Sequence, residues 1–287
     1  MSNRRKGIAA YLLIAFGMAW ASWEIPIGHA VNSFSFRLRG AFAPAIAAFI
    51  VRKWITHEGF SDAGLRPNLR KWPYYIVGWF LPLIVVGCIV IVAPVVGVGK
   101  PDFSLVRVMK YLVSNGVPVG LSRPWTVICG LVISAIFSAP INFGEEFGWR
   151  GYLQPRLFPS RPVLGAVATG IIWAYWHLPL SLGGGYFFPD HPLMGAIVIY
   201  PVSAIFISII FGWLVLKTRS IWSSSLAHAA TNRIGATLVV LLFGGGAGAE
   251  AIFVSYAGIL AWIPLGALSL WIVLTGQLKP EKHKTLR

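Results

Sequence analysis

Apolar residues run along this chain in long stretches that short polar segments separate. A stretch of ~20 apolar residues spans the hydrocarbon core of a bilayer as a helix. We count eight candidates, at about residues 7–30, 40–55, 73–98, 125–143 and onward, 163–182, 193–216, 220–243 and 251–277. The second is the weakest and must tilt, or let Arg39 and Arg52 reach the membrane interfaces. The pattern predicts an all-α, polytopic membrane protein with about eight transmembrane helices.

Composition leads to the same class of protein. Hydrophobic residues make up 56% of the chain and charged residues 11%, whereas soluble domains carry ~25% charged residues. The longest polar stretch, at about 52–72, is too short to hold a core of its own. We therefore expect one integral-membrane domain over residues 1–287. Cys88 and Cys129 both fall in predicted spans and indicate neither a disulfide framework nor a metal cluster.

The net charge of +15 is distributed unevenly along the chain. If the N-terminus is cytoplasmic, the inner segments hold 16 Lys and Arg residues and the outer segments hold 6. This is the bias that orients membrane proteins, and it predicts both termini in the cytoplasm, at the plasma membrane if the cell is prokaryotic. We interpret the basic excess as topology and contact with anionic membrane lipid, and not as a nucleic-acid surface.

Glu145, Glu146 and Arg150 lie in an apolar region of a chain that has only nine acidic residues. A charge in hydrocarbon costs at least ~2.5–3.5 kcal/mol, so intramembrane acids are functional by default. On a helix Glu146 and Arg150 share a face, and Glu145 points about a third of a turn away. One carboxylate can then be held by the guanidinium while the other faces a cavity and titrates. An ion pair at a helix end, without chemistry, is the alternative.

Two further polar pairs stand at one-turn spacing in apolar segments. Trp173 precedes His177 by four residues and can shield its imidazole from lipid, although a histidine bonded to a neighbouring helix is an equal alternative. His228 precedes Asn232 by four, and an imidazole and an amide on one face can donate to a single oxygen, as an oxyanion hole does. Polar contacts between helices are the alternative there.

The three pairs together indicate a hydrolytic site, because carboxylate, imidazole and amide groups can activate a water and stabilise an oxyanion. Glu145 and His177 must then meet at one depth. Counted along their helices, Glu145 lies ~30 Å from Trp125 and His177 lies ~21 Å from Val163. The helix that carries Glu145 is therefore predicted to be long, or bent near Pro140.

At this point the chain resembles the CPBP family, which comprises CAAX-prenyl-protease and bacteriocin-processing (Abi) membrane enzymes of the Ras-converting type. That family is marked by EExxxR, then (F/W)xxxH, then HxxxN or HxxxD on successive membrane helices. Here these stand as Glu145-Glu146 with Arg150, Trp173 with His177, and His228 with Asn232, and the motif region covers about residues 133–232. One departure is Gly148, where the family is usually bulkier.

The resemblance implies roles for these residues. Glu145 and His177 would activate the attacking water, and His228 and Asn232 would stabilise the oxyanion. The supporting residues would be Glu146, Arg150 and Trp173. No cofactor is required by the sequence. Zinc remains open, with Glu145, His177 and His228 as possible ligands, although the HExxH spacing is absent and Asn232 suits an oxyanion donor better.

We therefore expect an intramembrane endopeptidase, of glutamate type or metal-dependent, that cleaves membrane-associated peptides or proteins. A non-catalytic binding or immunity protein could use the same buried cluster. A proton-coupled transporter could also use it, but such proteins often show internal repeats and interrupted helix pairs, and we see neither clearly. Processing of a peptide that is lost in Glu145, His177 and His228 variants separates the first reading from the others. The natural substrate cannot be read from the sequence.

Overall fold

A computed structural model describes residues 2–24, 40–103, 106, 110, 114, 124–183, 188, 190–244 and 250–279. All regular structure in these ranges is helical, which confirms the expected all-α class. The longer helices are α1 (Asn3–Glu24), α4 (Trp72–Val95), α6 (Pro124–Gly148), α8 (Pro162–Trp176), α11 (Tyr200–Thr218), α12 (Ile221–Ala230) and α15 (Trp262–Leu274). The shorter α-helices are α3 (Ala43–Ile50), α7 (Gln154–Leu157), α9 (Leu178–Gly183), α10 (Pro192–Met194), α13 (Thr237–Phe243) and α14 (Ala251–Val254).

Short turns of other helix types join or continue these α-helices. The π-helical turns are η1 (Val51–Ile55), η4 (Trp149–Leu153), η5 (Gly195–Ile199) and η6 (Thr231–Ala236), and the 3₁₀ turns are η2 (Leu69–Lys71) and η8 (Ile259–Ala261). Single π-helical turns inside longer helices are frequent at functional sites. Two of them, η4 and η6, contain residues that the sequence analysis selected.

Six helical segments of the described chain are long and apolar enough to cross a membrane. They are Asn3–Trp23, Leu69–Val95, Trp125–Leu157, Pro192–Thr218, Ile221–Phe243 and Ala251–Leu274. The expected number of eight is not confirmed, because two of the expected spans are shorter. The helix from Pro162 is apolar but ends at Trp176, where His177 forms its C-cap. The second expected span is reduced to α3 and η1.

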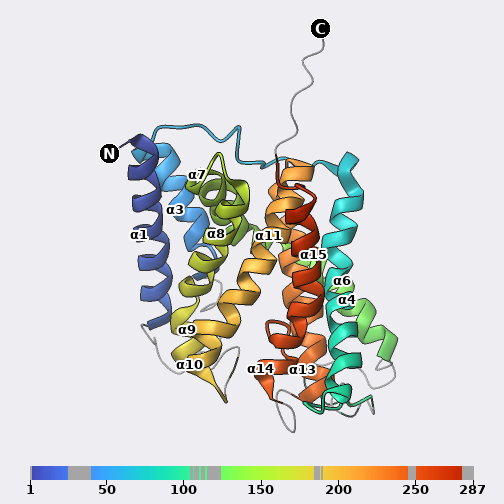
Figure 1. The fold of residues 1–287 in the computed structure, drawn as a ribbon. Coiled ribbons are helices and arrows are strands. Elements are labelled where there is room, and N and C mark those ends of the chain that lie inside the picture. The colour runs from blue at the N-terminus through green and yellow to red at the C-terminus, as the bar shows by residue number, and fades with distance from the viewer. Residues whose placement is uncertain are drawn as a thin grey trace.

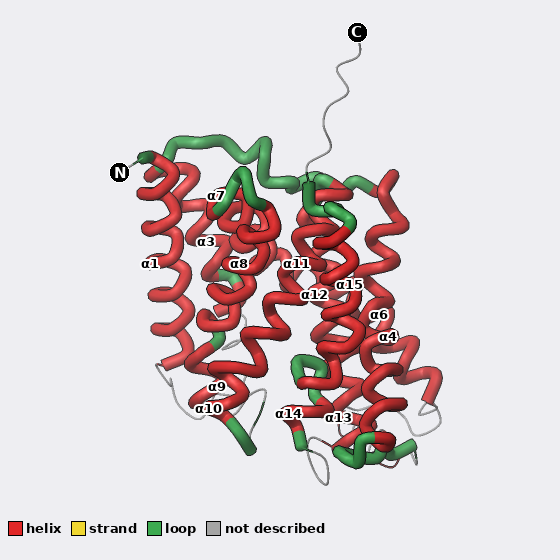
Figure 2. The backbone as a smooth tube through the Cα atoms, viewed as in Figure 1, coloured by secondary structure: helices red, strands yellow, loops and turns green. Residues whose placement is uncertain are grey.

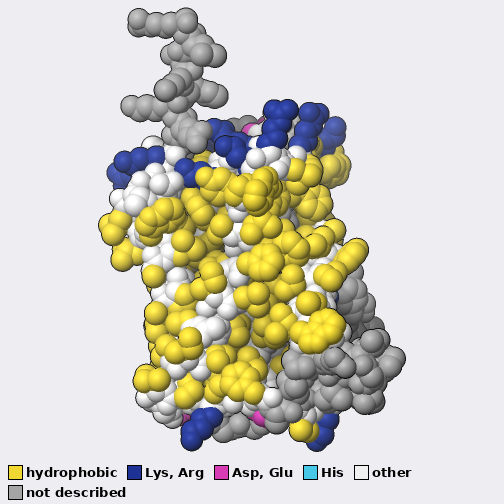
Figure 3. Space-filling model, turned by 90° about the vertical axis from the view of Figure 1, so that its right-hand side faces the viewer, with side chains coloured by type: hydrophobic (Ala, Val, Ile, Leu, Met, Phe, Trp, Pro, Cys, Tyr) yellow, Lys and Arg dark blue, Asp and Glu magenta, His cyan; other side chains and the backbone are white. Residues whose placement is uncertain are grey.

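The helices form a bundle in which α1 begins and α15 ends at the same end of the molecule (Figure 1). The described loops lie mostly at its two ends (Figure 2). Figure 3 shows apolar side chains over the middle of the face in view and Lys and Arg side chains at its ends. This is the surface of an integral membrane protein, with an apolar band between charged ends.

The segment that carries Glu145 is a continuous helix through α6, η4 and α7. It runs over Trp125–Leu157, which is 33 residues, so the expected long helix is confirmed. Pro140 lies inside α6. On its two sides α6 packs against α12 and α3, and α8 packs against α11. These contacts bring the three motif-bearing segments into one part of the bundle.

Gly148 has a structural reason in this packing. A Cβ atom at this position would lie 2.4 Å from the Cβ of Pro44 in α3 and 2.5 Å from the hydroxyl oxygen of Tyr11 in α1. Any larger residue would push one of these helices away. The departure from the family pattern thus lies where residues of α1 and α3 pack directly against the long helix.

Candidate active site

Glu146, Arg150 and His228 form a buried polar contact between the long helix and α12. Arg150 donates from Nη1 to Oε1 of Glu146 at 2.8 Å, and Nδ1 of His228 lies 3.0 Å from the same oxygen. The Glu146 side chain is fully buried, and Arg150 and His228 are 4% exposed. The spacing of four between Glu146 and Arg150 therefore places them on one helix face, as the sequence indicates.

Arg150 is held on its other sides by aromatic rings. Its guanidinium carbon lies 5.0 Å from the ring centroid of Trp173 and 5.1 Å from that of Phe211. A cation over an aromatic face is attracted by the ring quadrupole, and more strongly where water is excluded. The buried charge is thus stabilised by one carboxylate and two rings, so Arg150 has a fixed position between α6, α8 and α11.

Glu145 has a different environment from its neighbour. Its Oε2 accepts hydrogen bonds from the indole N–H of Trp173 at 2.8 Å and of Trp149 at 3.4 Å. It is 8% exposed. Two neutral donors orient this carboxylate without a cation bound to it directly. The structure therefore separates the two adjacent carboxylates into an ion-paired one, as the sequence suggests for Glu146, and one held by neutral groups.

His177 lies at the end of α8, where the helix stops and α9 begins. Its Nδ1 lies 3.0 Å from the backbone oxygen of Trp173 and 3.3 Å from the hydroxyl oxygen of Tyr200. Because a carbonyl oxygen only accepts, Nδ1 carries the proton in this contact, and Nε2 then carries the lone pair. Trp173 thus connects the two groups: its indole binds Glu145 and its carbonyl binds His177.

Asn232 lies at the edge of this group and is exposed. A π-helical turn, η6, begins at Thr231, between His228 and Asn232. Asn232 donates from Nδ2 to Oδ1 of Asn142 in α6 at 3.0 Å, and Asn142 donates to the backbone oxygen of Ser138 at 2.9 Å. His228 contacts Glu146, whereas Asn232 contacts Asn142. The structure therefore does not join this pair to one partner.

The sequence leaves open a zinc site at Glu145, His177 and His228. Among the described residues, no group of three or more His, Cys, Asp or Glu side chains is arranged to hold a metal ion. Nδ1 of His228 contacts Glu146, and Oε2 of Glu145 is bound by indole groups. These contacts use Nδ1 of His228 and Oε2 of Glu145, and the chemistry below is derived from the side chains alone.

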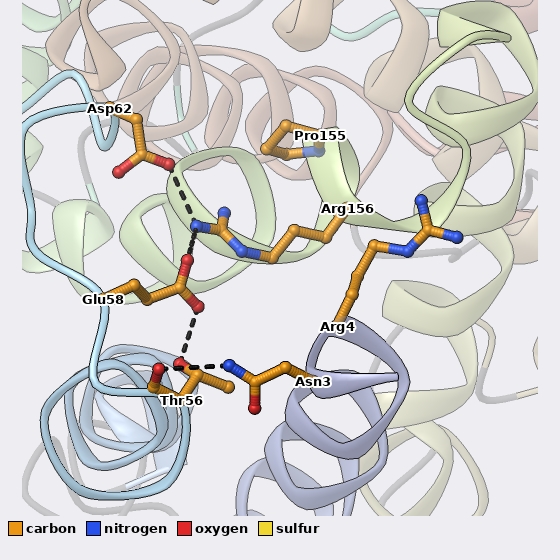
Figure 4. Close-up of a pocket in the computed structure, with 7 residues that line it drawn as sticks. All are labelled: Asn3, Arg4, Thr56, Glu58, Asp62, Pro155 and Arg156. Atoms are coloured by element: carbon orange, nitrogen blue, oxygen red, sulfur yellow. Dashed lines mark hydrogen bonds and ion pairs between the residues drawn. The ribbon is translucent and has the colours of Figure 1, made fainter. Parts of the chain in front are cut away.

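A second polar group lies at the end of the bundle where α1 begins, and we call it the surface cluster (Arg52, Glu58, Asp62 and Arg156). Arg156 donates to Glu58 at 2.6 Å and to Asp62 at 2.9 Å. A cavity of about 370 Å³ lies beside it and is lined by Asn3, Arg4, Thr56, Glu58, Asp62, Pro155 and Arg156 (Figure 4). None of the residues selected from the motifs lines this cavity.

Arg52 is the buried member of the surface cluster at the end of the bundle. Its side chain is fully buried. It donates to Asp62 at 2.7 Å, to the backbone oxygen of Gly59 at 2.5 Å, and to that of Gly151 at 2.8 Å. Gly151 follows Arg150 in η4, so Arg52 ties the loop at one end of the bundle to the turn that positions Arg150. Sequence reasoning gave no signal for this contact, nor for Tyr200.

The surface cluster lies outside the apolar band, and its arginines control its acids. Partial burial raises the pKa of Asp62, but hydrogen bonds and the charges of Arg52 and Arg156 outweigh this effect and lower it from 3.8 to about 2. Burial also raises the pKa of Glu58, while Arg156 and Thr56 hold it below its ordinary value. Both groups are therefore ionised at neutral pH.

An all-helical, membrane-spanning chain with buried carboxylate, imidazole and guanidinium groups has the features of a functional site within a membrane. Residues 124–234 match the family described as type II CAAX prenyl endopeptidase, Rce1-like. This match contains all three motifs and agrees with the resemblance that they carry, and the matched family is one of proteases. None of the curated proteins matches the chain.

Proposed function

We propose that this protein is an intramembrane endopeptidase that hydrolyses peptide bonds in membrane-associated peptides or proteins. The observation that carries the proposal is the link through Trp173, which holds the Glu145 carboxylate and the His177 imidazole at one buried place. The family match supports peptidase activity in general. The role of each residue and the substrate are inferred from the contacts and from chemistry.

Water activation is assigned to Glu145 and His177. Both indoles donate to Oε2 of Glu145, so Oε1 is the oxygen oriented to accept a proton from a water. His177 offers the lone pair on Nε2, because its Nδ1 proton is given to the Trp173 carbonyl. A water between the two groups would lose a proton to this pair as it attacks the carbonyl carbon of the scissile bond.

Oxyanion stabilisation is assigned to His228 and Asn232. Asn232 uses one amide hydrogen toward Asn142, and its second can point to the oxyanion. Nδ1 of His228 faces a carboxylate oxygen and therefore carries a proton. Its Nε2 donates only in the imidazolium form, so that form is the one proposed to act. Collapse of the tetrahedral intermediate then breaks the C–N bond, and the proton taken from water passes to the leaving amine.

The start of α1 and the end of α15 lie at the same end of the bundle (Figure 1), which supports the prediction of both termini in one compartment. We propose the cytoplasm for that compartment, on the charge distribution. Partners are then membrane lipid and a membrane-associated peptide.

The direct test is processing of peptides by the purified protein in lipid vesicles. Glu145→Gln and His177→Gln are expected to lower the cleavage rate at least about a hundredfold, the range for a general base. Glu58→Gln, the same change in the surface cluster, serves as the matched control and should retain the rate. If Glu145→Gln and His177→Gln both cleave like the unmodified protein, the peptidase proposal fails. Proton flux through the vesicles that Glu145→Gln abolishes would instead support the transporter.

A further inference from the structure

Arg233 carries a charge at an unusual position in this membrane protein. It follows Asn232 in η6, and its residue is exposed on the surface of the bundle. It lies within the span Ile221–Phe243. Its Nε donates to the hydroxyl oxygen of Ser138 in α6 at 2.8 Å. No acidic side chain in the described part of the chain is paired with it, unlike Arg52, Arg150 and Arg156.

Two spans agree that this arginine is deep in the apolar band. Arg233 lies ~18 Å along the helix from Ile221, the first residue of its span. Its partner Ser138 lies ~20 Å from Trp125 and farther still from Leu157, the ends of the long helix. The guanidinium is therefore far from both ends of the bundle. Ionisable side chains at such a depth mark pathways for water, ions or substrate, because a bare charge facing lipid is unfavourable.

Arg233 is connected to the candidate active site by a chain of hydrogen bonds, which we call the α6–η6 seam (Ser138, Asn142, Asn232 and Arg233). Arg233 donates to Ser138, the backbone oxygen of Ser138 accepts from Asn142, and Asn142 accepts from Asn232. Asn232 is the proposed oxyanion donor. The seam holds Nε of the guanidinium in place, and the terminal amino groups donate no hydrogen bond to the described residues.

We propose that Arg233 binds a carboxylate of the substrate peptide and thereby selects which peptides are cleaved. This inference rests on the proposed peptidase function. A guanidinium with Nε fixed presents a planar fork that matches the two oxygens of a carboxylate, and such bonds are strong where water is scarce. The depth of the residue argues against a lipid phosphate, because headgroups lie outside the hydrocarbon core. The carboxylate comes from an acidic side chain of the peptide or from its C-terminus.

The position of Arg233 beside Asn232 also limits how far the recognised carboxylate can lie from the scissile bond of the peptide. The Asn232 amide and Nε of Arg233 bind Asn142 and Ser138, which lie ~6 Å apart along α6, so the fork of Arg233 lies on the order of 10 Å from the Asn232 amide. An extended peptide covers that distance in roughly three residues. The scissile carbonyl, bound at Asn232, and the recognised carboxylate are therefore expected within about three residues of each other.

The experiment uses the full chain in vesicles and fluorescent peptides anchored by one acyl chain. We first select the peptides that the unmodified protein cleaves and that the Glu145→Gln variant does not cleave. Each selected peptide is then prepared with a free or an amidated C-terminus, and with Asp or Asn near the cut. The unmodified protein is expected to prefer one carboxylate form at least about tenfold in kcat/KM. The arm that shows the preference identifies the source of the carboxylate.

Arg233→Gln is expected to reduce that preference to within about twofold, while cleavage of the neutral peptide continues. Arg66→Gln, the same change at an exposed arginine of a loop, should keep the preference. A preference that persists in Arg233→Gln overturns the inference and leaves the peptidase proposal standing. Absence of any Glu145-dependent cleavage overturns the peptidase proposal itself.

A second variant covers the case in which Arg233→Gln does not fold. Arg233→Lys keeps the charge and loses the fork, so it should retain an intermediate preference for the carboxylate peptide. A full preference in Arg233→Lys would show that the charge alone suffices and would overturn recognition by the fork. If the unmodified protein cleaves fastest the peptide that has an amidated C-terminus and Asn near the cut, recognition of a carboxylate is overturned.

Discussion

The long helix Trp125–Leu157 carries two arginines in opposite situations. Arg156 in the surface cluster binds two acids, Glu58 and Asp62, and also the backbone oxygen of Tyr152. Arg150 is bonded to one acid, and its Nε and second amino nitrogen are buried without a partner among the described residues. Buried donors are normally satisfied by protein or water. Arg156 therefore has the properties of a structural joint, whereas Arg150 keeps two donors that could bind a water or a substrate oxygen.

The largest expected difference between the two clusters concerns activity. Glu145→Gln keeps the size of the side chain and an oxygen for the indoles, but removes the negative charge that would accept a proton. We expect cleavage to fall at least about a hundredfold. Glu58→Gln removes an acid of the surface cluster and should leave the rate within about threefold. Measured cleavage rates of the two variants, side by side, decide whether the clusters differ in function.

The second largest difference is expected in the free energy of unfolding when the arginine of each cluster is replaced. Arg150→Met leaves the fully buried Glu146 without its cation, which costs about 3–5 kcal/mol when one partner of a buried ion pair is removed. Arg156→Met breaks contacts to acids that are partly exposed, and should cost about 1 kcal/mol or less. Unfolding in detergent, followed with increasing denaturant, gives both values. Equal losses would contradict the distinction between the clusters.

Arg52 links the two clusters and should have an intermediate effect. Arg52→Lys keeps the charge but cannot hold Asp62 and the Gly151 oxygen with one planar group, so we expect a loss of about 1–3 kcal/mol. Because Gly151 adjoins Arg150, kcat should also fall severalfold while KM stays near its original value. The matched control is Lys53→Arg, the reverse exchange at the next, exposed residue. An unchanged kcat would show that the Gly151 contact does not position the site.

The smallest effect is expected on stability at low pH, through the protonation of Asp62. The pKa of Asp62 is lowered from 3.8 to about 2 in the folded protein. A lowered pKa means that the ion pair adds stability above pH 3.8 and that this stability is lost as the pH falls through 2. Since the Asp62 side chain is 56% exposed, solvent screening should keep the contribution below about 1 kcal/mol. Melting at pH 5, 3 and 2 should show the loss in the unmodified protein and not in Asp62→Asn.

Helix periodicity predicted contacts within one segment well. The four-residue spacing of Glu146 and Arg150 gave their ion pair, and the need for one common depth gave the long helix. Contacts between segments were harder to predict. Trp173 was expected to shield His177, and its ring does pack against it, but its indole N–H binds Glu145. A spacing rule does not say which partner on another helix a side chain will find.

Arg52 shows why some of the site could not be predicted. Its partner Gly151 is 99 positions away and uses a backbone oxygen, which every residue has. No residue type marks such an acceptor in a sequence. The expected number of spans was not confirmed for a similar reason. Hydropathy sums apolar residues and does not detect that His177 caps α8 and divides one expected span. The order of the three motifs, in contrast, is a property of the chain itself, and the resemblance it carries agrees with the family match over residues 124–234.

The close approach at Gly148 has a consequence for how this molecule can be divided. Its absent side chain makes room for Pro44 and Tyr11, which belong to α3 and α1 and precede the family-matched residues 124–234. Moving that matched portion alone into another protein would leave the surface at Gly148 without the two helices that cover it. A working transplant would have to include α1 and α3, so the smallest transferable unit is larger than the segment that contains the motifs.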